Sequence, residues 1–196
     1  MWDDHAGLHA HREAAQLLAE HPWPRLYDPD RLARNEVPVA ATVYVDDIYV
    51  ERALAEDIGE GDVTSRYFIP EDRRACAFVA VRKDGVVSGV ELAARVFSTV
   101  DPELDVEILI ADGSCVAAGA LLIRVEGSAR SILTAERTAL NFLQRLSGVA
   151  TLTARYVEQI KGTNTRILDT RKTTPGYRLL EKKAVVHGGG TNHRMG

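Results

Sequence analysis

The chain has 196 residues, and its 24 Lys and Arg against 28 Asp and Glu give a formal net charge of −4. So mild a charge does not indicate a nucleic-acid partner, and 45% hydrophobic with 27% charged residues is typical of a globular protein rather than a disordered or fibrous one. The length falls short of the roughly 250 residues that a complete (β/α)₈ barrel requires.

Neither the apolar runs nor the N-terminus predicts a membrane or secreted protein. The longest apolar run, Val116–Ile123, is far below the roughly 18 residues of a membrane span. The chain begins with acids and histidines, where a secretory signal has a basic region followed by an apolar run. We therefore expect a cytoplasmic protein that binds neither membrane nor nucleic acid, with Cys76 and Cys115 as reduced core residues.

Residues 1–60 are expected to be mainly helical, with amphipathic stretches at His11–Leu18 and around Ile48–Glu56. The segment Glu56–Thr64, with its glycines, acids and a Thr that can cap a helix, predicts a loop. Surface positions are favoured over a metal site for the four N-terminal histidines, because no cysteine or carboxylate partner has ligand spacing. These are His5, His9, His11 and His21.

Short β-strands are expected next, around a helix at 91–100 whose one face carries Leu92, Val96 and Phe97. The expected strands are at 75–82, 86–90, 106–110 and 120–127. Turns at Lys83–Gly85 and Asp112–Gly113 separate strands. This order predicts an α+β domain around a largely antiparallel sheet.

Two amphipathic helices should follow, one over 131–148 that Gly148 ends and one over 151–161 that Gly162 ends. The polar face of the first is formed by Arg137, Asn141 and Gln144.

The last 36 residues are basic, with 8 Lys and Arg against 2 Asp and Glu (net 8 − 2 = +6). Thr165–Asp169 is β-prone, Tyr177–His187 is helical, and Gly188–Gly190 stops the helix. This is one β/α unit of a parallel sheet or barrel, with a second strand starting at the C-terminus.

Function in α/β folds collects at the carboxyl ends of strands, and two groups of polar side chains fall there. Asp169 is placed to orient neighbouring cations. Five donors could converge from two adjacent units: Arg171, Lys172, Asn192, His193 and Arg194. Such a set suits a small polyanion, because Arg offers a planar fork and Lys a compact charge. The glycine run could let backbone approach a ligand, but it serves equally as a helix terminator or joint.

Other reaction classes find no support in the sequence. The GxSxG elbow and a Cys/His arrangement are both missing, which disfavours covalent catalysis. Neither a P-loop nor a strand-associated GxGxxG occurs.

Five motifs in this order resemble the quinolinate phosphoribosyltransferase family, also called carboxylating nicotinate-nucleotide pyrophosphorylase. They are EDIGEGDVTS (56–65), RKDGVVSGVE (82–91), ERTALNFLQRLSGVAT (136–151), LDTRKTTPGYR (168–178) and HGGGTNHRMG (187–196). The resemblance covers about residues 45–196.

The resemblance implies an α/β (α+β) fold, with an N-terminal α/β sandwich domain over 1–130. Residues 131–196 would then be linking helices and the first units of an incomplete α/β barrel. It also implies a homodimer whose active sites lie between subunits.

The implied reaction joins quinolinate to phosphoribosyl pyrophosphate with Mg²⁺, giving nicotinate mononucleotide, pyrophosphate and CO₂ in NAD synthesis. By motif, Arg171, Lys172, His193 and Arg194 would bind quinolinate, with Lys172 as the catalytic residue. Arg137 would reach into the neighbouring subunit's site. No residue of this chain is assigned to the metal.

Two residues depart from the family pattern, which commonly has Leu in place of Tyr177 and an aromatic residue in place of Lys183. The sequence also stops at Gly196, before the barrel residues that handle Mg²⁺ and the phosphoribosyl donor. We therefore expect this chain alone to be inactive. The alternatives are a non-enzymatic dimerising fragment and a related phosphoribosyltransferase of the same fold.

Overall fold

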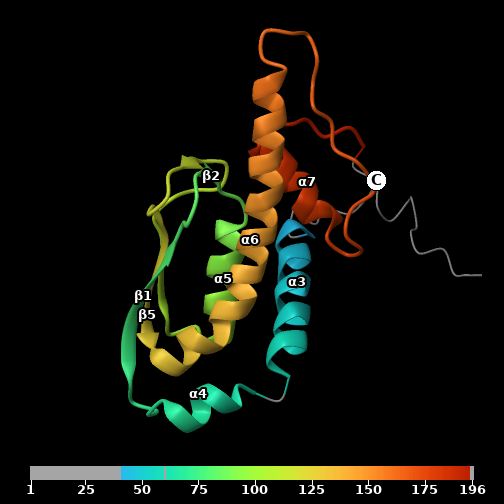
Figure 1. Ribbon diagram of the computed structural model, residues 1–196. Coiled ribbons are helices and arrows are strands. Elements are labelled where there is room, and N and C mark those ends of the chain that lie inside the picture. The colour runs from blue at the N-terminus through green and yellow to red at the C-terminus, as the bar shows by residue number, and fades with distance from the viewer. Residues whose placement is uncertain (1–40, 60, 195–196) are drawn as a thin grey trace, which may run out of the picture. The chain divides into compact units, whose positions relative to one another are not determined.

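The computed structural model describes residues 41–59 and 61–194, which form antiparallel strands covered by helices (Figure 1). The elements in chain order are α3 (Ala41–Ile58), α4 (Val63–Phe68), β1 (Arg74–Ala80), β2 (Gly85–Val86), α5 (Val90–Val100), β3 (Asp105–Ile108), β4 (Cys115–Val116), β5 (Leu121–Ser128), α6 (Ala129–Gln159) and α7 (Arg178–His187). The helix predicted at His11–Leu18 and the four N-terminal histidines lie outside the described residues.

The predicted antiparallel sheet is confirmed. Its strand order is β1-β5-β3, and both Ala77 and Val106 stand opposite Val125. A second sheet pairs β2 with β4. Because side chains alternate along a strand, Ile123 and Val125 of β5 turn inward and are buried against the helices.

Helix α5 lies between the three-stranded sheet and α6, and α3 packs on α5 and α6 (Figure 1). The predicted apolar face of α5 is confirmed, since Leu92, Val96 and Phe97 are all buried. The core is therefore formed between the inner face of the sheet and the α5–α6 pair.

The loop predicted at Glu56–Thr64 is shorter, because α3 extends to Ile58 and α4 begins at Val63, with Asp62 rather than Thr64 as its N-cap. Oδ1 of Asp62 accepts a hydrogen bond from the backbone N–H of Ser65 at 3.1 Å, which starts α4. The side-chain and backbone hydrogen bonds of Ser65 hold the pKa of Asp62 below its ordinary value.

The prediction of two helices separated at Gly148 is wrong, because α6 is one helix from Ala129 to Gln159. Gly148 is exposed on α6, while Leu146 and Ala150 on either side of it are buried. Packing of these neighbours outweighs the modest cost of a glycine within a helix. The predicted domain boundary at residue 130 falls in the first turn of α6 and stays a prediction.

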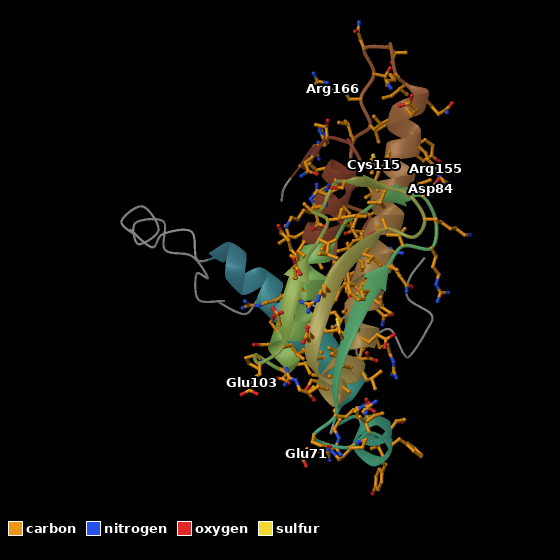
Figure 2. The ribbon with its side chains drawn as sticks, turned by 90° about the vertical axis from the view of Figure 1, so that its left-hand side faces the viewer. Glu71, Asp84, Glu103, Cys115, Arg155 and Arg166 are labelled. Carbon is orange, nitrogen blue, oxygen red and sulfur yellow. The ribbon has the colours of Figure 1, made fainter. Side chains whose placement is uncertain are left out.

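Both cysteines were expected in the core, and both are exposed free thiols. In β1 the inward positions alternate with outward ones, and Cys76 falls on the outward side. Cys115 lies in β4, and its side chain is labelled in Figure 2. A two-stranded ladder has little surface to cover such a side chain, so the general tendency of Cys to be buried does not apply.

The C-terminal β/α unit is present in reduced form. The predicted strand at 165–169 makes a single parallel bridge, Leu168 with Thr191, and the predicted helix is α7. The mixed α/β class is thus confirmed, and the described residues contain no closed barrel.

The glycine run after α7 allows close packing on α6. A Cβ atom added at Gly188 would lie 2.3 Å from the carbonyl oxygen of Ala150 and 2.7 Å from Cβ of Thr153. A Cβ at Gly190 would lie 2.6 Å from Cγ1 of Val185. Gly189 has a positive φ of 84°, which suits the turn that ends α7.

Two glycine-to-alanine substitutions should change stability in opposite directions. Gly188→Ala should lower the free energy of unfolding by about 1–3 kcal/mol, because its Cβ meets backbone that must move. Gly148→Ala should raise it by about 0.5–1 kcal/mol, because its Cβ meets nothing within 4 Å and alanine favours the helix. Urea unfolding of both variants tests this, and equal effects would contradict it.

Candidate functional site

The two segments that carry the candidate binding residues both leave the parallel bridge at its C-terminal end. The backbone N–H of Asp169 donates to the carbonyl of Thr191 at 3.1 Å, and the N–H of Thr191 donates to the carbonyl of Ile167 at 2.8 Å. The first segment continues to Arg171 and Lys172, and the second continues to His193 and Arg194. All four of these side chains are exposed. The structure thus brings the two segments together and leaves these four side chains accessible to a ligand.

A buried carboxylate joins the two segments. The side chain of Asp169 is 3% exposed and pairs with Nζ of Lys182, which is 2% exposed. Its Oδ1 also accepts a hydrogen bond from the backbone N–H of His193 at 3.1 Å. With its amide oriented to donate, Asn192 places its nitrogen 2.7 Å from Oδ2 of Asp169. One carboxylate therefore holds the start of both loops.

The charge state of Asp169 follows from these contacts. Burial alone would raise the pKa of this carboxyl group, but the Lys182 ammonium and the His193 N–H outweigh burial and hold the pKa below its ordinary value. Asp169 is consequently a carboxylate at neutral pH.

A second buried carboxylate fixes the far end of the first loop. Glu181 of α7 accepts hydrogen bonds from Thr174, with its Oε2 3.2 Å from the backbone N and its Oε1 2.7 Å from Oγ1. Arg145 of α6 contacts the same Oε1 through Nη2 at 2.7 Å and donates to Oγ1 of Thr174 at 2.8 Å. Although burial would raise the pKa of Glu181, hydrogen bonds from Arg145 and Thr174 lower it overall.

Arg137 pairs with a carboxylate of α3. Its side chain is 74% exposed on α6, and its Nη1 is 3.2 Å from Oδ1 of Asp57 in α3. The other oxygen of Asp57 accepts a hydrogen bond from Oγ1 of Thr138 at 2.8 Å. The structure therefore leaves Arg137 pointing outward, in contact with α3.

The sequence interpretation missed three charged residues at the site: Arg145, Glu181 and Lys182. Charged residues in an amphipathic helix are normally assigned to the solvent face, yet Glu181 and Lys182 are buried between Leu180 and Ala184. No local signal in α7 marked them, because Lys182 lies on the opposite side of the helix from the buried Leu180 and Ala184.

The two departures from the family pattern fit their surroundings. The ring of Tyr177 lies 5.9 Å from that of Phe142 and 6.1 Å from that of Tyr49, centroid to centroid. Burial raises the pKa of Tyr177, with smaller contributions from Glu56 and Tyr49. Lys183 is exposed, and its Nζ is 3.3 Å from a carboxylate oxygen of Glu91 in α5.

A metal centre built from protein side chains alone needs several ligating groups close together. In 41–59 and 61–194, no three His, Cys, Asp or Glu side chains are grouped so that they could hold a metal ion. No helix in this part of the chain is long and apolar enough to cross a bilayer.

Two models of one protein family match this chain, one over the sheet and the first part of α6 and one over the C-terminal part. The family model "Quinolinate phosphoribosyl transferase, N-terminal domain" matches residues 62–147, and the corresponding C-terminal domain model matches 149–196.

Individual relatives match over three quarters of the chain. Decarboxylating quinolinate phosphoribosyltransferase 1b of Nicotiana tabacum is 47% identical over 148 residues, which are 75% of this chain and 42% of that protein. The probable carboxylating nicotinate-nucleotide pyrophosphorylase of Synechocystis sp. is 43% identical over 76% of this chain and 50% of its own length. The chain spans about half the length of these relatives.

The solved nicotinate-nucleotide pyrophosphorylase from Francisella tularensis superposes with a TM-score of 0.74 at 43% identity. The match covers 78% of this chain and 55% of that one. A sheet domain that leads into a parallel β/α unit is thus shared with a phosphoribosyltransferase-class enzyme of known structure. The chain belongs to the quinolinate phosphoribosyl transferase family.

Replacing Glu181 by Gln should give a pH-dependent loss of stability. Because the folded-state pKa of Glu181 lies below its ordinary 4.5, the carboxylate stabilises the fold above about pH 4.5, and that contribution disappears as pH falls through the folded-state pKa. We expect Glu181→Gln to lower the free energy of unfolding by about 1–3 kcal/mol at pH 7 and by much less near pH 3.

Urea unfolding across this pH range measures the difference. Glu158→Gln is the control, because the Glu158 carboxylate of α6 is exposed and pairs with exposed Lys161 just beyond the helix. A deficit of Glu181→Gln that stays constant from pH 7 to pH 3 would contradict the assignment.

Proposed function

We propose that this chain supplies the quinolinate-binding part of an enzyme of NAD synthesis. The reaction joins quinolinate to phosphoribosyl pyrophosphate and yields nicotinate mononucleotide, pyrophosphate and CO₂. The observation that carries the proposal is the parallel bridge between Leu168 and Thr191, because the two loops with the candidate binding residues both follow it directly. The family membership and the names of the relatives support the same reaction.

Two loops with several cationic donors suit a dianion such as quinolinate, which bears two adjacent carboxylates. The guanidinium groups of Arg171 and Arg194 offer paired N–H donors in a plane, and that geometry matches a carboxylate. His193, next to Arg194 in the sequence, adds a further donor. Bound in this way, quinolinate would be oriented with its ring nitrogen toward the phosphoribosyl donor.

The chemistry needs no protein nucleophile. The ring nitrogen forms a bond to C1 of the ribose as the bond from that carbon to pyrophosphate breaks. The resulting pyridinium accepts the electron pair left when the adjacent carboxylate departs as CO₂, and the ring carbon then takes up a proton. We assign Lys172 the catalytic role of stabilising negative charge near the reacting groups.

We further propose a homodimer in which Arg137 completes the partner's site. The support is that the side chain of Arg137 is exposed and that its ion pair is with Asp57 of α3. Tyr67 and Phe68 of α4 are each 80% exposed, which leaves apolar surface for a partner subunit. Mg²⁺ is part of this proposal as a companion of phosphoribosyl pyrophosphate, and no described residue is assigned to it.

The cytoplasm is the location that we propose. Some plant relatives have chloroplastic or mitochondrial in their names, so the point is open to test. Fractionation of cells that express the protein, with immunodetection, checks it, and recovery in a membrane or organelle fraction would overturn it.

Arg171→Ala should weaken quinolinate binding by about 2–5 kcal/mol, because one carboxylate of a desolvated charge pair loses its partner. Isothermal titration calorimetry of the chain with quinolinate measures this. Lys161→Ala removes an equal, exposed charge just beyond the end of α6 and should leave the affinity unchanged. Unaltered affinity in Arg171→Ala would remove Arg171 from the site.

The same titration separates the alternatives. Nicotinate lacks one of the two carboxylates, so equal competition by nicotinate would favour a related phosphoribosyltransferase. Assay of the 196-residue chain for pyrophosphate release addresses the non-enzymatic fragment. We expect quinolinate binding without turnover, because no described residue is assigned to Mg²⁺, the companion of phosphoribosyl pyrophosphate.

A mixture of two damaged chains should regain binding if sites are shared. Arg137→Ala and Arg171→Ala chains each lose their sites alone, whereas a mixed dimer has one site with both arginines intact. After random exchange of equal amounts, calorimetry should detect about one site per four chains. Absence of any recovered binding, in a sample shown by native mass spectrometry to contain mixed dimers, would contradict the shared site.

A further inference from the structure

Two neighbouring residues of α7 with opposite charges hold the two ends of one loop. The loop in question, residues 170–173, contains Arg171 and Lys172, and we refer to it as the cation loop. Lys182 pairs with Asp169 just before the cation loop, and Glu181 binds the backbone N–H and hydroxyl of Thr174 just after it. Both α7 side chains are buried, unlike the cations between their attachment points.

We propose that Lys182 is a positioning residue, acting through Asp169, that sets the relative placement of the two quinolinate-binding loops. This inference rests on the proposed function. Lys182 does not itself touch the substrate. Its ammonium holds the Asp169 carboxylate in the orientation in which Oδ1 receives the backbone N–H of His193.

The burial of this ion pair argues for a role beyond stability. Taking an ammonium and a carboxylate out of water costs free energy that their attraction often does not fully offset, and apolar replacements of similar volume are often as stable. Lys182 and Asp169 are 2% and 3% exposed. What an apolar pair cannot reproduce is the acceptance of hydrogen bonds from the second loop.

The contacts of Asp169 identify what is positioned. Its carboxylate accepts from the backbone of His193 and, with the amide oriented to donate, from Asn192, both in the second loop. Asn192 also lies 3.2 Å from the carbonyl oxygen of Lys182 in that orientation. Rotation of the Asp169 carboxylate would therefore remove the side-chain hydrogen bonds that hold residues 192 and 193, although the two backbone hydrogen bonds of the bridge would remain.

The Glu181 contacts prevent the cation loop from moving together with the second loop. Because Thr174 is bound to Glu181 and Arg145, its far end is tied to both α7 and α6. Movement at the Asp169 end would then change the spacing between Arg171 and Arg194 rather than shift both loops as a unit. A displacement of about 1 Å in such a site can cost on the order of a hundredfold in function.

The test separates the charge pair from the hydrogen-bond acceptor. Lys182→Met alone leaves a buried carboxylate without its partner, and this variant alone can fail to fold. Asp169→Leu/Lys182→Met replaces the pair by apolar side chains and removes the acceptor. Asp169→Asn/Lys182→Met also removes both charges but keeps an acceptor oxygen for the N–H of His193.

Quinolinate affinity by calorimetry and thermal unfolding are measured for both double variants. We expect the Leu/Met variant to unfold within a few degrees of the parent and to bind quinolinate about ten- to a hundredfold more weakly. The Asn/Met variant should recover most of that affinity. Lys183→Met, which removes the neighbouring exposed charge on α7, should bind as the parent does.

Hydrogen exchange without ligand gives an independent readout of the loops. Amides at 192–194 should exchange faster in the Leu/Met variant than in the parent or in Lys183→Met. Unchanged exchange, unchanged affinity, or equal affinity loss in the Leu/Met and Asn/Met variants would each overturn the positioning role. If either double variant unfolds, the exchange and affinity of Lys182→Arg decide, because this variant keeps the charge and should behave as the parent.

The failure of the proposed function has a different signature. In that case the parent chain itself shows no quinolinate binding, whereas the effect on hydrogen exchange remains.

Discussion

The contact on which the site depends is the buried carboxylate of Asp169. It lies at the end of a parallel pairing that consists of one bridge, so the backbone alone has little to hold the two segments in register. The carboxylate adds a charged acceptor shared by Lys182 and the backbone of His193. Hydrogen bonds to a charged group are stronger than those between neutral groups, and here they replace part of a strand ladder.

Helix α6 carries this organisation into the rest of the fold. It packs on α5 and on the β2 segment, and it receives α7 where Gly188 lies against Ala150. The same helix carries Arg137 in its N-terminal half and, two turns later, Arg145, which pairs with Glu181. An uninterrupted helix keeps these two arginines in a fixed position relative to Ala150, against which Gly188 packs, whereas a joint at Gly148 would not.

Much of the fold could be predicted from local pattern. The strands of the three-stranded sheet, α5 and α7 all carry apolar residues at the spacing that their packing requires, and each lies close to its predicted range. Of the strand predicted at 86–90, only Val86 is in a strand, because α5 already begins at Val90. The predictions were wrong where packing in the tertiary structure outweighed a local preference. Gly148 looked like a helix end, but the buried Leu146 and Ala150 continue the helix, and the alternation of β1 turned Cys76 outward.

The sequence by itself determined the family, the antiparallel character of the sheet and the placement of Arg171, Lys172, His193 and Arg194 in two short motifs, because motifs and periodicity are properties of short segments. Only the tertiary structure decided which charges are buried and what they hold. Glu181 and Lys182 lie side by side in a helix, and nothing local distinguishes them from a solvated pair. Their partners lie up to 36 residues away, and burial beside those partners is what gives the two charges their role.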